Sequence, residues 1–329
     1  MKAARVTSIL VVLALSAGMA NAVLITDYME YGDTSGDLQQ FHTANTANWL
    51  LDHWYKNPST LTNTESYNTS TATSSNVPLA TSLVFNVPGY VGNTNGGIAV
   101  GNANHTTGYA LLRPLASPAT GTVWASFLAR ATDFYSLPGA VGIRAQLCVN
   151  FLGGTAIGIA AGLPNPPYTA DGLLRPAFRT AGAANGGWGT GNPTPLTNGV
   201  NSYLVVGKFV SNASGVNDSM TMWLIDPGAD LTGRNVSALD SQNVFTQSVG
   251  GLDIWGNSIT NFGLLLHSIY GPKDGAYNQF AYLDNLRISV GETLSDDMHV
   301  YEVLTGVQIP EPSALLALAG LAMVAFWRR

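Results

Sequence analysis

The acidic residues that could cleave a glycosidic bond are few and scattered along this chain of 329 residues. A glycosidase generally holds two carboxylates close together across the sugar. Asp296 and Asp297 are adjacent, so on a strand they would point to opposite faces, and we interpret them as solvated residues. The sequence has five glutamates, none with another acid two positions away: Glu30, Glu65, Glu292, Glu302 and Glu311. This distribution does not favour a glycan-cleaving site.

Histidine, serine and cysteine offer no other catalytic group. The sequence lacks the His-x-His and His-Glu-x-x-His spacings of metal sites and the Gly-x-Ser-x-Gly turn of a hydrolase. We interpret His267, in the apolar run 262–270, as a core histidine. Cys148 is the only cysteine, cannot form an internal disulfide and is interpreted as a small buried residue. We therefore expect no catalytic residues and a protein that is not an enzyme. The histidines are His42, His53, His105, His267 and His299.

Residues that could bind rather than cleave a glycan occur near turns. Trp188 lies in the glycine-rich stretch 186–191 and Trp255 in the stretch 253–257, and exposed aromatic rings are common in sugar sites. Asp226 and Asp230 flank a turn and could hold calcium. Each has an alternative role, because a tryptophan beside glycines can close the end of a core and a turn aspartate can cap its own backbone. Calcium is the one cofactor considered, and otherwise none is expected.

The middle of the chain alternates between apolar and polar residues with the period of β-strands. Residues 121–134 are the longest example, and residues 83–87, 202–211 and 261–268 follow the same pattern. Turn sequences rich in Gly, Asn and Pro separate these segments. The spacing predicts about ten to fourteen strands over roughly 285 residues, which suits a single large two-sheet sandwich.

Three of these segments resemble strands of the laminin-G-like, concanavalin-A-like jelly rolls of bacterial surface proteins. Residues 203–210 and 220–227 look like the adjoining central strands of that family. Residues 280–289 look like its closing strand, which would pair with the first strand near residues 23–31. The resemblance implies an all-β, two-sheet jelly-roll sandwich, with another β-sandwich or a β-helix as the alternative.

The same fold also hosts glycosidases and polysaccharide lyases. A secreted glycan-processing enzyme is therefore the alternative function. The retaining glycosidases of this fold carry Glu-x-Asp-x-Glu on one strand, and that pattern is absent from this sequence.

The N-terminus has the features of a secretory signal peptide. Two basic residues precede an apolar stretch at residues 9–15, and Ala20 and Ala22 form a cleavage site of A-x-A type. Signal peptidase would then cut after Ala22, and the mature chain would begin at Val23.

The C-terminus combines a short turn, an apolar run and two cations. Pro310, Glu311 and Pro312 precede an apolar helix expected over residues 314–327, and Arg328 and Arg329 end the chain. These features resemble the PEP-CTERM sorting signal, which an exosortase, a membrane-embedded cysteine transpeptidase, recognises. The resemblance implies transient insertion in the inner membrane with the arginines on the cytoplasmic side. A plain tail anchor or a buried terminal helix is the alternative.

The charge balance sets the class of partner. The chain has 14 basic and 20 acidic residues, so its surface does not attract nucleic acid. We expect an exported protein at the cell surface or in the extracellular matrix, with a structural or adhesive role and contact with extracellular polysaccharide. Exosortase and signal peptidase are its expected processing partners.

The expected domain order follows from these features. Residues 1–22 are the signal peptide, residues 23–295 the β-sandwich domain, residues 296–308 a short stalk and residues 309–329 the sorting signal.

Overall fold

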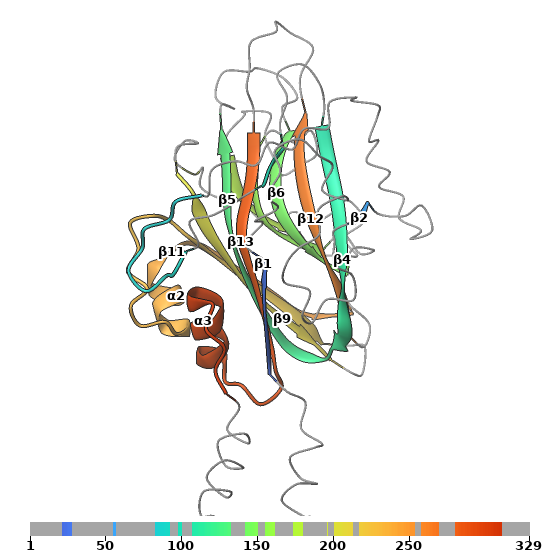
Figure 1. Ribbon diagram of the computed structural model, residues 1–329, viewed down its shortest axis with the longest axis vertical. Helices are drawn as coiled ribbons and strands as arrows, with labels where there is room; N and C mark the ends of the chain where they lie inside the picture. The colour runs from blue at the N-terminus through green and yellow to red at the C-terminus, as the bar shows by residue number, and fades with distance from the viewer. Residues whose placement is uncertain are drawn as a thin grey trace, which may run out of the picture.

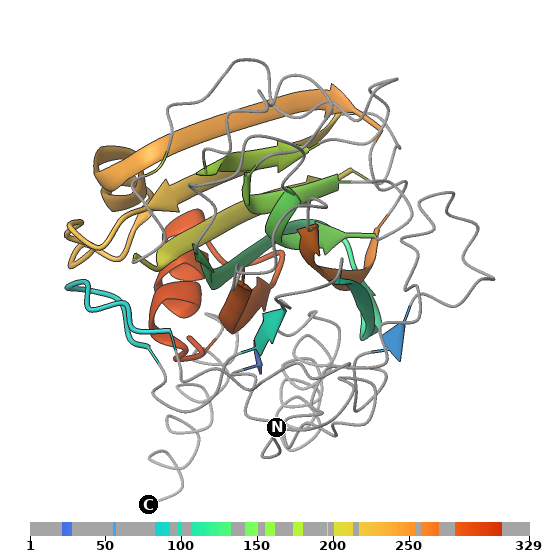
Figure 2. The ribbon, with the colours of Figure 1, turned by 90° about the horizontal axis from the view of Figure 1, so that it is seen from above.

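The computed structural model describes two antiparallel β-sheets that face each other (Figure 1 and Figure 2). The described residues are 22–27, 55–56, 83–92, 98–100, 107–132, 142–150, 155–161, 174–179, 196, 201–212, 217–253, 258–269 and 280–310. The predicted signal peptide and the apolar helix 314–327 lie outside them. Within the described residues, no helix has both the length and the apolar character needed to span a bilayer. The prediction of a mostly β, two-sheet protein is confirmed.

The first sheet has seven strands. Its order is β1-β13-β5-β9-β10-β11, and β3 pairs with β13 beside this path. Val23 of β1 faces Val290 of β13, so the prediction that the closing strand pairs with the first strand is confirmed. The strands are β1 (Val23–Asp27), β3 (Ile98–Val100), β5 (Gly121–Thr132), β9 (Tyr203–Ser211), β10 (Asp218–Ile225), β11 (Asn243–Leu252) and β13 (Phe280–Val290).

The second sheet has six strands in the order β2-β4-β12-β6-β7-β8, and all of its pairs are antiparallel. The central strand β12 pairs with β4 on one side and β6 on the other, although β6 precedes it by more than 100 residues. The strands are β2 (Tyr55–Lys56), β4 (Thr107–Ala119), β6 (Gly142–Val149), β7 (Thr155–Ala161), β8 (Leu174–Arg179) and β12 (Ile259–Ile269).

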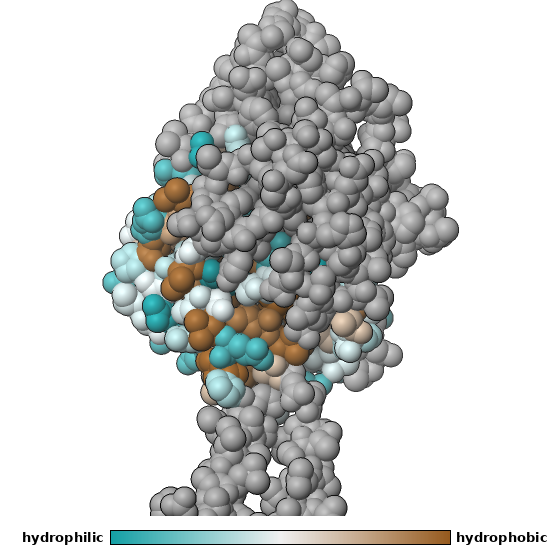
Figure 3. Space-filling view, viewed as in Figure 1, coloured by the Kyte–Doolittle hydropathy of each residue, from teal (hydrophilic) through white to brown (hydrophobic). Residues whose placement is uncertain are grey.

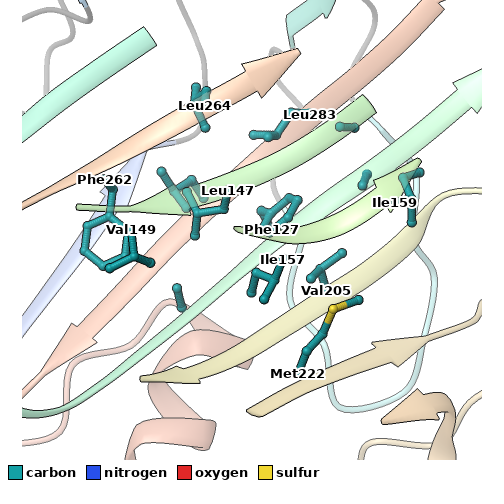
Figure 4. Packing of buried hydrophobic residues seen from close by; sticks show 14 of the residues in the cluster. Phe127, Leu147, Val149, Ile157, Ile159, Val205, Met222, Phe262, Leu264 and Leu283 are labelled. Atoms are coloured by element: carbon teal, nitrogen blue, oxygen red, sulfur yellow. The ribbon is translucent and has the colours of Figure 1, made fainter. Parts of the chain in front are cut away.

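A hydrophobic core fills the space between the sheets (Figure 4). Alternate residues of the long strands, such as Ala145, Leu147 and Val149 of β6, point into it, as strand geometry requires. Phe127 and Val205 come from the seven-stranded sheet, and Leu147, Ile157 and Phe262 come from the six-stranded sheet; all five are fully buried. This burial of apolar side chains is the main force that holds the sheets together.

A second apolar cluster covers the outer face of the seven-stranded sheet. Helix α2 (Val236–Gln242), helix α3 (Asp296–Thr305) and the segment 83–92 pack on this face (Figure 1, Figure 2). Trp124 of β5 and Trp223 of β10 stack at its centre with ring centroids 5.3 Å apart. Residues 83–87, which the alternation predicts as a strand, form no strand; Leu83 N instead donates to Oδ2 of the buried Asp284.

Residues 296–308, expected to form a short stalk, contain helix α3. Ser295 caps the first turn of α3 by accepting a hydrogen bond from Met298 N. Asp296 and Asp297 lie in that turn, where negative charge interacts favourably with the helix dipole. Gly306 ends the helix in the left-handed conformation. The helix buries Val300, Val303 and Leu304 against the sheet, so it belongs to the folded domain. Figure 3 shows hydrophobic residues gathered around β1 and α3 at the lower end of the described surface.

Candidate functional site

The two aspartates considered for calcium cap their own turn. Asp226 Oδ1 accepts from Gly228 N at 3.0 Å, and Asp230 Oδ1 accepts from Thr232 N at 2.9 Å. The hydrogen bonds from Thr232 lower the pKa of the Asp230 carboxyl. Among the described residues, no group of three or more His, Cys, Asp or Glu side chains could hold a metal ion. This geometry supports the alternative in which the two carboxylates stabilise the turn.

The other predicted binding and sorting residues are mostly outside the described part of the chain. Trp188 and Trp255 lie outside it, and so do the remaining predicted residues Ala20, Glu311, Pro312, Arg328 and Arg329. Ala22 is described and buried, and Pro310 is described and exposed. These last two mark the points where the predicted signals join the folded domain.

The two ends of the domain meet at one corner. Gln308 Nε2 donates to Ala22 O at 2.7 Å, which joins residues 286 positions apart in the chain. Ile309 N donates to Glu302 Oε1, also at 2.7 Å, so the last residue before Pro310 is bound to helix α3. The predicted signal-peptide junction and the start of the sorting signal therefore lie side by side.

A buried polar cluster anchors this corner. Ser289 Oγ of β13 lies 2.6 Å from His299 Nδ1 and also bonds Glu302 Oε2, and both partners belong to α3. His299 Nε2 lies 3.1 Å from Gly291 O. The side chains of Ser289, His299 and Glu302 have no solvent exposure. Every polar atom of the cluster named here has a partner, as buried polar groups require.

Hydrogen bonds and burial set the protons of this cluster. Gly291 O can only accept, so His299 Nε2 carries a proton. Ser289 Oγ donates to Glu302 Oε2. Burial lowers the pKa of His299 and raises the pKa of Glu302, so it disfavours the charged form of each group. The cluster is a structural link between β13 and α3, closed to substrate.

A hollow of about 350 Å³ opens beside this corner. It lies between the ends of β1, β4 and β13, and its lining includes Val23, Leu115, Val290 and Glu292. Thr120 Oγ1 donates to Glu292 Oε1 at 2.6 Å at its edge. The described lining combines apolar walls with one carboxylate that is already bonded, and it includes no pair of acids.

The outer face of the six-stranded sheet has a floor of small residues. Its inward positions pack in the core, whereas its outward positions on β6, β7 and β8 include Cys148, Ala156, Gly158, Ala160 and Ala177. A Cβ atom at Gly158 would lie 2.2 Å from Ala145 O, so the backbone of β6 and β7 admits only glycine there. Cys148, Ala156, Ala160 and Ala177 are all buried at these positions.

Gln146 of β6 points to this outer face, and both of its side-chain polar atoms lack a hydrogen-bond partner. The register pairs Gln146 with Gly158, which pairs in turn with Ala177 of β8. Gln146 has no solvent exposure, and neither Oε1 nor Nε2 has a hydrogen-bond partner. A buried amide without partners costs about 1–3 kcal/mol for each lost group. Such an amide calls for a functional explanation.

Basic residues are concentrated in the same sheet. Its six strands contain Lys56, Arg113, Arg144, Arg175 and Arg179 but no aspartate or glutamate. Arg113 faces the other sheet, where its Nη1 donates to Asp27 Oδ2 at 2.9 Å. Arg175 and Arg179 occupy outward positions of β8, and the register places Arg144 in one row with Arg175.

Sequence reasoning missed the cluster of Ser289, His299 and Glu302 and the buried amide of Gln146. Ser289 lies on a different element from its partners, and the spacing of His299 and Glu302 brings them together only in a helix. Gln146 lies in a segment with the ordinary alternation of a strand. The signal that could have revealed it is a glutamine at an outward position amid Gly and Ala.

Three comparisons place these features among known proteins. The model of the PEP-CTERM protein-sorting motif matches residues 308–329. No curated protein matches the chain. Solved structures with some similarity include an alginate lyase from Chlorella virus. The two are 10% identical, the match covers 61% of this chain and 87% of the lyase, and the TM-score is 0.37. Winged bean acidic lectin has 12% identity over 60% of this chain and 88% of its own, with a TM-score of 0.36.

A glycosyl hydrolase family protein from Mycobacterium fortuitum has 14% identity, covers 82% of this chain and 100% of its own, and has a TM-score of 0.37. All three TM-scores lie below 0.5, so these likenesses carry no conclusion about activity or ligand. The predicted sorting signal, in contrast, is confirmed by the motif match. This chain carries at its C-terminus a PEP-CTERM protein-sorting motif, which implies export and exosortase sorting to the cell surface.

Proposed function

We propose that this protein is a structural or adhesive component of the cell surface or extracellular matrix, with a jelly-roll domain of the laminin-G-like, concanavalin-A-like type that contacts glycan. The observation that carries the proposal is the sorting motif over residues 308–329, which follows directly on residues bound to the folded domain. Signal peptidase would release the chain after Ala22, and exosortase would process the tail.

The described polar groups support binding rather than catalysis. Ser289, His299 and Glu302 are the residue types of a hydrolase triad, but the imidazole and the carboxyl both contact the same hydroxyl. In a triad the acid instead orients the far nitrogen of the histidine. All three side chains are fully buried, so a substrate cannot reach the hydroxyl. We therefore assign the cluster to stability.

The candidates for glycan contact are Trp188 and Trp255, proposed from sequence and outside the described residues. A hydrolytic or lyase activity on the same glycan is the competing function.

The sorting proposal is tested in the native host by mass and location. Intact mass and cell fractionation are compared for the wild type and a variant with Pro310→Ala, Glu311→Ala and Pro312→Ala. The expected result is loss of the tail and surface delivery in the wild type and retention in the inner membrane in the variant. A wild-type protein that keeps its tail in the inner membrane, with no effect of the substitutions, would refute the proposal.

The binding proposal is tested on the same purified protein. Retention on insoluble polysaccharide and release of reducing or unsaturated sugars are measured together. Retention without product is the expected result. Product release that exceeds the buffer control would instead favour the glycan-processing enzyme.

A further inference from the structure

We infer that folding closes the signal-peptidase site, so that the cut after Ala22 has to precede the pairing of β1 with β13. The inference rests on the proposed release after Ala22 and adds the order of two events, cleavage and folding. A precursor that folds first keeps its signal peptide. The bond concerned joins Ala22 to Val23, the first residue of β1.

The residue before the predicted cut is packed inside the corner where the two ends of the domain meet. Ala22 is 4% exposed and is one of the buried apolar residues of the domain. A Cβ atom built on Gly291 would lie 3.0 Å from Ala22 Cβ, so the backbone that follows β13 lies directly against this side chain. Signal peptidase selects a small residue at this position. Its binding pocket cannot take the side chain of Ala22 while Gly291 covers it.

The backbone on both sides of the bond is held as well. Gln308 Nε2 donates to Ala22 O at 2.7 Å, and the register pairs Val23 with Val290 of β13, beside which β1 lies (Figure 1). Hydrolysis adds the hydroxyl group of water to the carbonyl carbon of Ala22 and a proton to the nitrogen of Val23, as the bond between them breaks. The enzyme therefore needs direct access to a carbonyl group that the folded corner holds. A protease reaches such a bond only when the segment opens locally.

The residues that close the site are among the last of the domain to be made. Val290 ends β13, and Gln308 follows Ala22 by 286 positions. At about 5–20 residues per second, synthesis of this stretch takes at least roughly 14 s. During that interval Ala22 lacks these partners. A chain that is exported as it is synthesised therefore offers an open site first and a closed site later.

The same corner leaves the start of the sorting motif open. Ile309 N is bound to Glu302 Oε1, but Pro310, the first residue of Pro-Glu-Pro, is exposed. Folding thus closes the N-terminal processing site but not the described start of the C-terminal one. The two processing sites differ in their dependence on folding.

The closing experiment measures cleavage of the full-length precursor by purified signal peptidase in detergent. One sample is the folded precursor, and the other is the same precursor unfolded in urea and diluted into the assay as the enzyme is added. N-terminal sequencing identifies the cut, and the initial rates are compared. We expect a cut before Val23 in the unfolded sample. The rate in the folded sample should be lower by about 100-fold or more, because cleavage depends on a rare, locally open state.

A matched variant isolates access to the bond from the residues that the enzyme recognises. Insertion of Gly-Ser-Gly-Ser between Ala22 and Val23 keeps every residue before the cut and moves Ala22 away from Gly291 and Gln308. The pairing of β1 with β13 is unchanged, and four added residues at the edge of the domain cost little stability. The folded variant should be cut after Ala22 at nearly the rate of the same variant unfolded.

The possible results separate this inference from the proposed processing. Equal rates in the folded and unfolded wild type would overturn the inference and leave the release after Ala22 standing. No cut before Val23 in either sample would refute the proposed release and the inference with it. A folded insertion variant that resists the enzyme as the wild type does would also contradict the inference, because its site no longer lies in the corner. If the insertion variant does not fold, the two wild-type samples decide alone.

Discussion

Substitution of Ser289 by alanine should destabilise the domain by roughly 2–4 kcal/mol. The hydroxyl is the only atom that joins the imidazole of His299 to Oε2 of Glu302, and all three side chains are fully buried. Ser289→Ala leaves two polar groups without a partner in a site that excludes solvent, and each such group costs about 1–3 kcal/mol. A water molecule cannot restore the lost hydrogen bonds in Ser289→Ala, because the removed oxygen leaves a space smaller than a water molecule.

Urea unfolding of the purified mature protein measures this loss. The midpoint should fall with the slope unchanged, because the surface exposed on unfolding is the same. Ser241→Ala is the matched control, since Ser241 Oγ is exposed on α2 and donates to Ala238 O within its own helix. Its effect should stay within about 0.5 kcal/mol. A Ser289→Ala loss of less than about 1 kcal/mol would refute the reasoning that each member of the cluster depends on the shared hydroxyl.

Three further predictions concern pH, packing and calcium. Burial lowers the pKa of His299 from 6.5, so the free energy of unfolding should decrease as pH falls below 6.5 and the unfolded chain binds a proton that the folded chain does not. Burial raises the pKa of Glu302 from 4.5, so the free energy of unfolding should also decrease as pH rises above 4.5 and the unfolded chain loses a proton that the folded chain keeps. In His299→Gln, urea titrations at a series of pH values should show only the decline with rising pH. Gly158→Ala should lower the free energy of unfolding by about 2–4 kcal/mol, because Gly158 has a positive φ and the new Cβ would overlap the carbonyl oxygen of Ala145. An unchanged urea midpoint would contradict this. Millimolar calcium should leave the melting temperature unchanged, because Asp226 and Asp230 cap their own turn; a rise that Asp226→Asn abolishes would show a calcium site.

Much of the strand pairing could be predicted from alternation along the chain. Residues 203–211 and 218–225 both alternate and are separated by a short polar stretch, which favours a hairpin, and they pair as β9 and β10. Helix α3 was missed for a physical reason. Its inward side includes His299 and Glu302, which are polar, so the apolar period of a buried helix is interrupted.

The candidate sites depended on long-range geometry that alternation does not contain. Gln146 and Gly158 are paired by register, and Ser289 meets His299 only because β13 lies under α3. Residues 83–87 alternate like a strand, yet the outer face of the seven-stranded sheet binds them as an apolar cover. In each case, the role of a residue or segment depends on a partner that lies on another element of the fold.

The predicted cut after Ala22 would change the corner at which the two ends of the domain meet. It would remove the Ala22 carbonyl group with the signal peptide, so Gln308 would lose its acceptor when the N-terminus is released. The predicted precursor would then be tethered at two neighbouring points, and the processed chain only through the segment that follows Ile309. Loss of one tether would give the domain the freedom to rotate about the other.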